Sequence, residues 1–237
     1  MEAILSTAAS RPSLPLALDH LVVAARSLDE GEAWLAQRIG QPLAAGGAHP
    51  GFGTHNRLLR LGASSYLELI APDPAQAVRR QLFGLDQAPV AKALAAGPVL
   101  LHVVFRVLAP ATLEEVLPRL AYDPGLPTAM TRGELRWRMT VLAGGGLAGG
   151  GLLPTIIDWG NAAHPCTRLP ESGVTLDALR LAGPRAVIAA FPAMSPPPSS
   201  ALVPTIHAAS CSTICAEFLV GARTIIIESV LPDRDLR

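Results

Sequence analysis

The chain has 237 residues, of which 50% are hydrophobic and 16% are charged. This balance is typical of a folded globular protein and excludes a largely disordered chain. Acidic and basic residues are equal in number, so the formal net charge is zero. A neutral chain gives no electrostatic reason to expect nucleic acid or a membrane surface as a partner. The three cysteines form no disulfide framework, which favours a reducing, cytoplasmic location, and no signal peptide is expected.

A first unit of strand, helix and three strands is predicted from the N-terminal part of the chain. Residues 18–25 (LDHLVVAA) form a β-branched run that predicts a strand. A helix is expected to begin after Ser27 and to end at Gly40, because these residue types favour the two ends of a helix. Three further strands are expected, a weak one within residues 41–54 and a hairpin formed by residues 55–61 and 65–70.

The same order of elements is predicted again after a helical connector over residues 74–96, which Pro89 is expected to interrupt. The predicted elements are a strand at 99–107, a helix at 112–120, a short strand at 127–131, and strands at 134–142 and 153–159. Residues 139–157 carry no charge, but six glycines and a proline favour a glycine loop between two strands over a membrane span.

Beyond residue 170 the repeated pattern weakens. Strands at 174–181 and 222–230 are expected, with a helix beginning at residues 185–191. Residues 186–216 contain no charged side chain and no periodicity, so no packed structure is predicted there. A shifted reading frame is an alternative explanation of that composition. We expect a domain over residues 16–170, with modules at about 16–73 and 97–162, and a C-terminal appendage at 171–237.

The two units carry a histidine and a carboxylate at positions that correspond when their strands are aligned. DHLVVAAR aligns with LHVVFRV, which pairs His20 with His102, and LELI aligns with IDWG, which pairs Glu68 with Asp158. Imidazole and carboxylate together suit a divalent metal such as Zn, Mn, Fe, Co or Ni. A metal held there would polarise adjacent oxygens of a substrate, while Glu68 serves as the catalytic proton carrier.

Each of these residues also has a purely structural interpretation. His20 and His102 can be hydrogen-bonded core histidines, and Asp158 at a strand end can make turn hydrogen bonds. Glu68 is different, because a carboxylate among apolar neighbours is costly to bury without a partner. His164, which precedes a proline, fits a turn better than a ligand.

Two further groups of residues are candidates for binding substrate. The motif HPGFGTHN contains His49, His55 and Asn56, which either contact the substrate or only shape the turn into the next strand. Arg136 and Arg138 share one face of a predicted strand. Facing inward, one of them would hold an anionic substrate with two hydrogen bonds; facing outward, both are ordinary solvated charges.

The stretches LDHLVVAARSLDEGEAWLAQRIG, HPGFGTHNRLLRLG and YLELIAPDP resemble the glyoxalase-like domain of the vicinal oxygen chelate superfamily. ELRWRM and IIDW continue the similarity, which covers roughly residues 16–185. The resemblance implies an α+β fold in which two β-α-β-β-β modules form a curled mixed sheet around one pocket. It also implies His20 and Glu68 as metal ligands of the first module and His102 and Asp158 as those of the second. Asp158 departs from the glutamate that metal-binding relatives often carry.

The superfamily includes isomerases, dioxygenases and proteins that only sequester small molecules, so the fold alone does not fix the reaction. We expect a metal-dependent lyase, isomerase or dioxygenase acting on a small molecule with vicinal oxygens. The alternative is a metal-free binding or sequestering protein with the same pocket. Domains of this kind can form homodimers, although nothing in the sequence shows that this one does.

Overall fold

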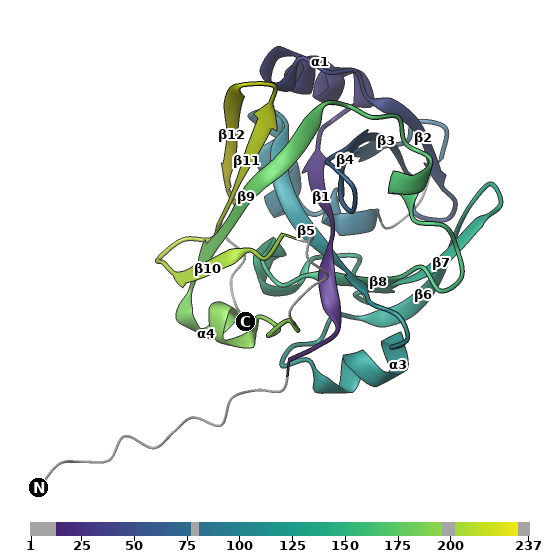
Figure 1. Cartoon of the computed structure of the whole chain (residues 1–237), viewed down its shortest axis with the longest axis vertical. Helices are drawn as coiled ribbons and strands as arrows, with labels where there is room; N and C mark the ends of the chain where they lie inside the picture. Colours follow the sequence, from purple (N-terminus) through teal and green to yellow (C-terminus); the bar gives the residue numbers. More distant parts are fainter. Residues whose placement is uncertain (1–12, 77–80, 196–201, 232–237) are drawn as a thin grey trace, which may run out of the picture.

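The computed structural model describes residues 13–76, 81–195 and 202–231, which form two β-sheets and several short helices (Figure 1). The larger sheet has the strand order β2-β3-β4-β1-β5-β8-β7-β6 and the smaller one the order β10-β9-β11-β12. The strands of the larger sheet are β1 (Leu16–Ala24), β2 (Ala44–His49), β3 (Thr54–Arg60), β4 (Tyr66–Pro72), β5 (Val99–Val107), β6 (Leu126–Arg132), β7 (Leu135–Val141) and β8 (Thr155–Asp158). Those of the smaller sheet are β9 (Val174–Gly183), β10 (Thr205–Ala208), β11 (Thr213–Val220) and β12 (Arg223–Val230).

The helices are α1 (Leu28–Ile39), α2 (Ala88–Ala95), α3 (Leu113–Val116) and α4 (Arg185–Ala190). As predicted, α1 begins at Ser27, whose side chain accepts a hydrogen bond from the Glu30 N–H, and ends at Gly40, which has a φ of 73°. Within the described ranges, none of the helices has the length and apolar character that crossing a membrane requires.

The larger sheet consists of two modules of one topology, which confirms the predicted α+β paired-module fold. The first is β1-α1-β2-β3-β4 and the second is β5-α3-β6-β7-β8. Within each module the first strand pairs in parallel with the last, and the antiparallel pair of β1 and β5 joins the modules. The outer strands β2 and β6 contact each other across the opening. The sheet therefore curls into a cup.

The two faces of this curled sheet carry separate hydrophobic clusters. The concave face holds the cluster that includes Val22, Ile70, Val104 and Ile157. The convex face packs against α1 and the smaller sheet, which lies beside β1 and β5 in Figure 1. Phe105 and Phe218 are fully buried in that second cluster. The C-terminal strands thus stabilise the back of the cup and leave its inside to the candidate site.

Two local predictions need correction. Residues 186–216 contain most of α4, all of β10 and the start of β11, although no packed structure was expected there. The segment lacks charges because it is partly core: Ile214 and Ala216 are fully buried. Its residues 196–201 lie outside the described part of the chain. Pro89, expected to interrupt the connector, lies in the first turn of α2, where a missing N–H costs no helical hydrogen bond.

Candidate active site

A β-bulge in β1 places two neighbouring side chains on the same side of the sheet. Leu18 pairs with Phe105 and His20 pairs with Val104, so Asp19 has no partner of its own in this ladder. Neighbouring residues of a regular strand point to opposite faces, and a bulge removes that constraint. The Nδ1 of His20 lies 2.7 Å from the Oδ1 of Asp19. Both side chains are buried.

Asp19 is the centre of a hydrogen-bond network that fixes this arrangement. Its Oδ2 accepts hydrogen bonds from the indole N–H of Trp159 at 2.8 Å and from the Nε2 of His164 at 3.0 Å. Arg106 lies 3.9 Å from the same oxygen. His164 also accepts a hydrogen bond from the Cys166 N–H, so it shapes a turn as expected and reaches Asp19 as well. Neither Asp19 nor Trp159 could be identified from the sequence, because their proximity depends on the bulge and on the fold.

On the other side of His20, Glu68 completes a line of buried groups. Its Oε2 lies 3.3 Å from the Nε2 of His20, and its Oε1 accepts a hydrogen bond of 2.5 Å from the amide of Asn56. The same amide is 3.2 Å from the Nε2 of His49, whose Nδ1 lies 2.9 Å from the hydroxyl of Thr54. The motif HPGFGTHN thus shapes the turn and also brings His49 and Asn56 into the site.

The charges of these groups depend on one another. Burial alone would raise the pKa of Glu68, but the hydrogen bond and charge of His20 lower it to about 2. Burial alone would lower the pKa of His20, but Asp19 and Glu68 raise it to about 9. The pKa of Asp19 is lowered as well, because hydrogen bonds from His164 and His20 outweigh the effect of burial. At neutral pH an imidazolium therefore lies between two carboxylates. His49 is neutral, because burial lowers its pKa.

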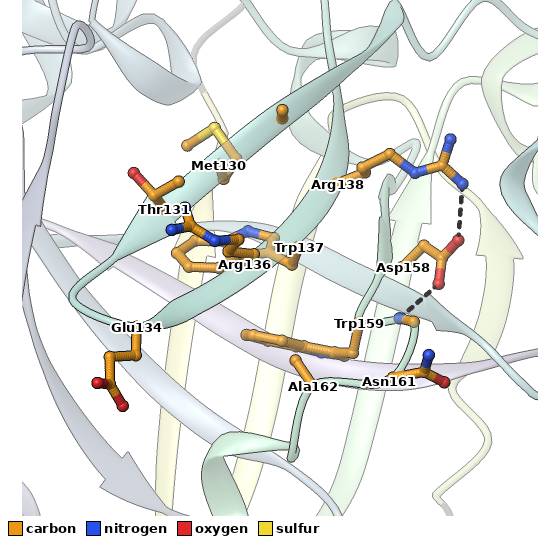
Figure 2. A pocket seen from close by; sticks show the side chains of 12 residues that line it. Met130, Thr131, Glu134, Arg136, Trp137, Arg138, Asp158, Trp159, Asn161 and Ala162 are labelled. Carbon is orange, nitrogen blue, oxygen red and sulfur yellow. Dashed lines mark hydrogen bonds and ion pairs between the residues drawn. The ribbon is translucent and has the colours of Figure 1, made fainter.

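These residues line a small cavity inside the cup, and a much larger pocket adjoins it. The inner cavity of about 20 Å³ is bounded by His20, His49, Asn56 and Glu68, with Tyr66 stacked on His20 at a ring distance of 4.6 Å. Further wall residues are Leu82, Phe83, Met130, Arg132, Trp137, Met139, Ile157 and Trp159. The larger pocket of about 550 Å³ lies beside β6, β7 and the turn after β8 (Figure 2).

A scan against protein-family models matches residues 18–192 to the model described as a glyoxalase-like domain. The chain belongs to the glyoxalase-like domain family. The match covers both modules of the curled sheet and ends shortly after α4, and it bears out the resemblance seen in the sequence. A search of curated proteins found no match.

Solved structures with a similar arrangement include methylmalonyl-CoA epimerase from Mycobacterium tuberculosis, with 22% identity and a TM-score of 0.41 over 63% of this chain and 92% of that one. A hypothetical protein from Staphylococcus aureus has 13% identity and a TM-score of 0.48, and covers 70% of this chain and 69% of its own. A hypothetical protein from Bacillus halodurans has 19% identity and a TM-score of 0.41, with 62% and 97% covered.

In this glyoxalase-like protein the register of the second module corrects the alignment of Glu68 with Asp158. Glu68 pairs with the residue two positions after His20, and Thr155 pairs with the residue two positions after His102. The Oγ1 of Thr155 lies 3.0 Å from the Nε2 of His102, as Glu68 lies beside His20. Thr155, and not Asp158, therefore occupies the position that corresponds to Glu68.

The other second-module candidates lie away from the inner cavity. His102 is fully buried, with its Nδ1 2.7 Å from the carbonyl oxygen of Gly151. Asp158 pairs with Arg138 in the strand register, while its neighbour Ile157 belongs to the cup interior. Its carboxylate accepts hydrogen bonds from Arg138 at 3.1 Å and from the Gly160 N–H at 2.8 Å. This is the turn hydrogen bonding that was the structural alternative for Asp158.

The candidate substrate-binding residues are divided between the two pockets. His49 and Asn56 line the inner cavity, and Arg136 and Arg138 line the larger pocket. His55 lines neither, because it alternates with Asn56 along β3 and lies 4.0 Å from Asp73 instead. Arg132, which was not among the residues predicted from the sequence, also lines the inner cavity.

The donor atoms present fit a metal only in the first module of this glyoxalase-like domain. Within the described residues, no three His, Cys, Asp or Glu side chains are already arranged as a metal site. His20 and Glu68 nevertheless direct a nitrogen and an oxygen toward each other, and Asp19 holds the opposite ring nitrogen, as a carboxylate does for many metal-binding histidines. The Nε2 of His49 is 3.7 Å from Glu68. His102 and Asp158 do not fit, since their polar atoms have other partners.

Proposed function

We propose that this protein is an enzyme that binds a divalent metal through His20 and Glu68 and acts on a small molecule with adjacent oxygens. The observation that supports this proposal is the position of His20 between two buried carboxylates, with only its Nε2 directed toward Glu68. The Nε2 of His20 and the Oε2 of Glu68 lie 3.3 Å apart, with Asp19 on the opposite ring nitrogen. A divalent cation in place of the proton on Nε2 would join the same two groups.

The ligand types are compatible with Zn, Mn, Fe, Co or Ni. Such a metal, when bound, supplies Lewis acidity toward the substrate oxygens. The chain itself supplies orientation and a water-poor environment: Asp19 fixes the ring of His20, and Asn56 holds the second oxygen of Glu68. Both carboxylates are buried, which strengthens their electrostatic effect.

Proton transfer is better assigned to His49 than to Glu68, which was our sequence-based candidate. With a pKa of about 2, Glu68 is a weak base near neutral pH. His49 lines the same cavity as a neutral imidazole. We propose that His49 accepts a substrate proton at Nε2 when the substrate replaces the Asn56 amide there, with Thr54 holding its other ring nitrogen.

The test is metal analysis of protein purified without chelator and after reconstitution with each candidate ion. We expect about one equivalent of metal per chain, and its loss in His20→Ala. His55→Ala is the matched control, because His55 lies on the same sheet outside the cavity, and it should keep its metal. Less than about a tenth of an equivalent after reconstitution would contradict the metal-dependent proposal.

The second candidate function is metal-free binding or sequestration of a small molecule. It is favoured by one observation: the imidazolium of His20 already joins Asp19 through Nδ1 and Glu68 through Nε2 in a satisfied network. A protein that binds ligands stoichiometrically with no bound metal and no turnover would support this alternative.

A further inference from the structure

The inner cavity and the larger pocket share three lining residues, Met130, Trp137 and Trp159. The inner cavity, at about 20 Å³, has room for about one water-sized group. The larger pocket, at about 550 Å³, falls in the range of about 300–1,000 Å³ of small-molecule sites. A substrate can thus place only a small group beside His20 and Glu68, and its remainder needs the larger pocket.

The residues shared by the two spaces form a wall that contains two indole rings, each about 8% exposed. The rings of Trp137 and Trp159 lie 5.3 Å apart with an angle of 36° between their planes, and Figure 2 shows them next to each other in the pocket. The hydrogen bond from Trp159 to Asp19 fixes one of these rings relative to the candidate active site. Indole faces bind flat, unsaturated molecules by offset stacking, which a saturated ring of similar size cannot reproduce.

The charges around the pocket are not equivalent. Arg138 is neutralised, because it pairs with both Glu114 and Asp158. The guanidinium of Arg136, by contrast, has neither a hydrogen-bond nor an ion-pair partner in the part of the chain that the structure describes. Glu134 also lines the pocket, but in Figure 2 its carboxylate points away from the two rings. Arg136 is therefore the available group for an anion bound beside the aromatic wall.

We infer that the larger pocket binds a flat aromatic carboxylate, with its ring against Trp137 and Trp159 and its acid group at Arg136. That this molecule is the body of the substrate rests on the proposed function, whereas the binding itself does not. The wall places the bound ring directly beside the cavity that contains His20 and Glu68.

The experiment is isothermal titration calorimetry of the full-length protein with 2-naphthoate. Two matched probes separate the contributions: decalin-2-carboxylate keeps the charge without the flat ring, and 2-naphthylmethanol keeps the ring without the charge. We expect both probes to bind about fivefold more weakly than 2-naphthoate. Arg136→Gln should weaken 2-naphthoate by about fivefold and leave 2-naphthylmethanol unchanged.

Arg38→Gln is the matched control variant, since Arg38 is an arginine stacked on Trp34 of α1, outside the pocket. It should bind 2-naphthoate like the wild type. Equal affinity of 2-naphthoate for Arg136→Gln and the wild type, or no saturable binding, would overturn the inference. His20→Ala should bind the probe within about twofold of the wild type, because the site is separate. If the protein binds 2-naphthoate but no metal, only the proposed function is contradicted. If it binds metal but not 2-naphthoate, only this inference is contradicted.

Discussion

At the scale of single residues, the candidate site depends on three buried side chains, Asp19, His20 and Glu68, whose pKa values depend on one another. The sequence was sufficient to select His20 and Glu68, because a histidine and a carboxylate inside apolar strands need a partner or a function. It was insufficient for Asp19, which would face the opposite side of a regular strand. Only the bulge brings Asp19 beside His20.

The shifted pKa values of His20 and Glu68 predict that the stability of the metal-free protein depends on pH. The pKa of His20 is raised from 6.5 to about 9, so its stabilising contribution is complete below pH 6.5 and is lost as the pH rises through 9. The pKa of Glu68 is lowered from 4.5 to about 2, so its contribution is present above pH 4.5 and is lost as the pH falls through 2. Urea unfolding across this pH range should show highest stability between 4.5 and 6.5.

His20→Gln should remove the decrease in stability on the alkaline side, since glutamine does not titrate. The comparison is the free energy of unfolding of both proteins at each pH, with chelator present. If the variant and the wild type lose stability in parallel above pH 6.5, the imidazolium of His20 does not join the two carboxylates as described.

A second prediction at the scale of residues concerns which cysteine thiol reacts first, because the thiols differ in exposure. Cys166 is buried, and burial raises the pKa of its thiol to about 11, so it has little thiolate at pH 8. Cys211 is exposed, whereas Cys215 is buried. We expect iodoacetamide to label Cys211 first in the native protein, as measured by peptide mass spectrometry. If Cys166 is labelled as fast as Cys211 without denaturant, the buried position of the Cys166 thiol is contradicted.

At the scale of elements, the order of helices and strands along the two modules was predictable from the sequence, whereas the register of the paired strands was not. The hydrophobic runs and turn residues were enough to predict both modules. The alignment of LELI with IDWG was wrong because it matched letters, whereas the parallel pairing of β5 with β8 places Thr155 at the position of Glu68. Register depends on the bulges and on the packing of both sheets, which a single short motif does not encode.

The close packing of β2 against β3 gives a prediction about Gly46, which contacts Asn56 of the motif HPGFGTHN. A Cβ at Gly46 would overlap the side-chain and carbonyl oxygens of Asn56, the residue that holds Glu68. Gly46→Ala should therefore destabilise the protein by about 1–3 kcal/mol in urea unfolding. Gly144→Ala is the matched control, because the nearest atom to its Cβ would be 3.9 Å away. Equal stabilities of the two variants would contradict this packing of Asn56.

At the scale of the whole molecule, the two modules have the same topology but different polar groups inside the cup. The first contributes a histidine between two carboxylates, whereas the second contributes a histidine beside a threonine. The Asp158 carboxylate of the second module lies outside the inner cavity and pairs with Arg138. The contact of β2 with β6 and the smaller sheet behind β1 and β5 explain why one chain encloses the site. The sequence showed the repeat; it did not show that the repeat is unequal.

The most direct test compares one conservative substitution in each module by the metal content of the purified proteins. Glu68→Gln and Asp158→Asn remove the same charge with little change of shape. The proposal predicts that Glu68→Gln loses the metal and that Asp158→Asn keeps the wild-type content. Retention in Glu68→Gln, or equal loss in both variants, would contradict the assignment of the site to the first module.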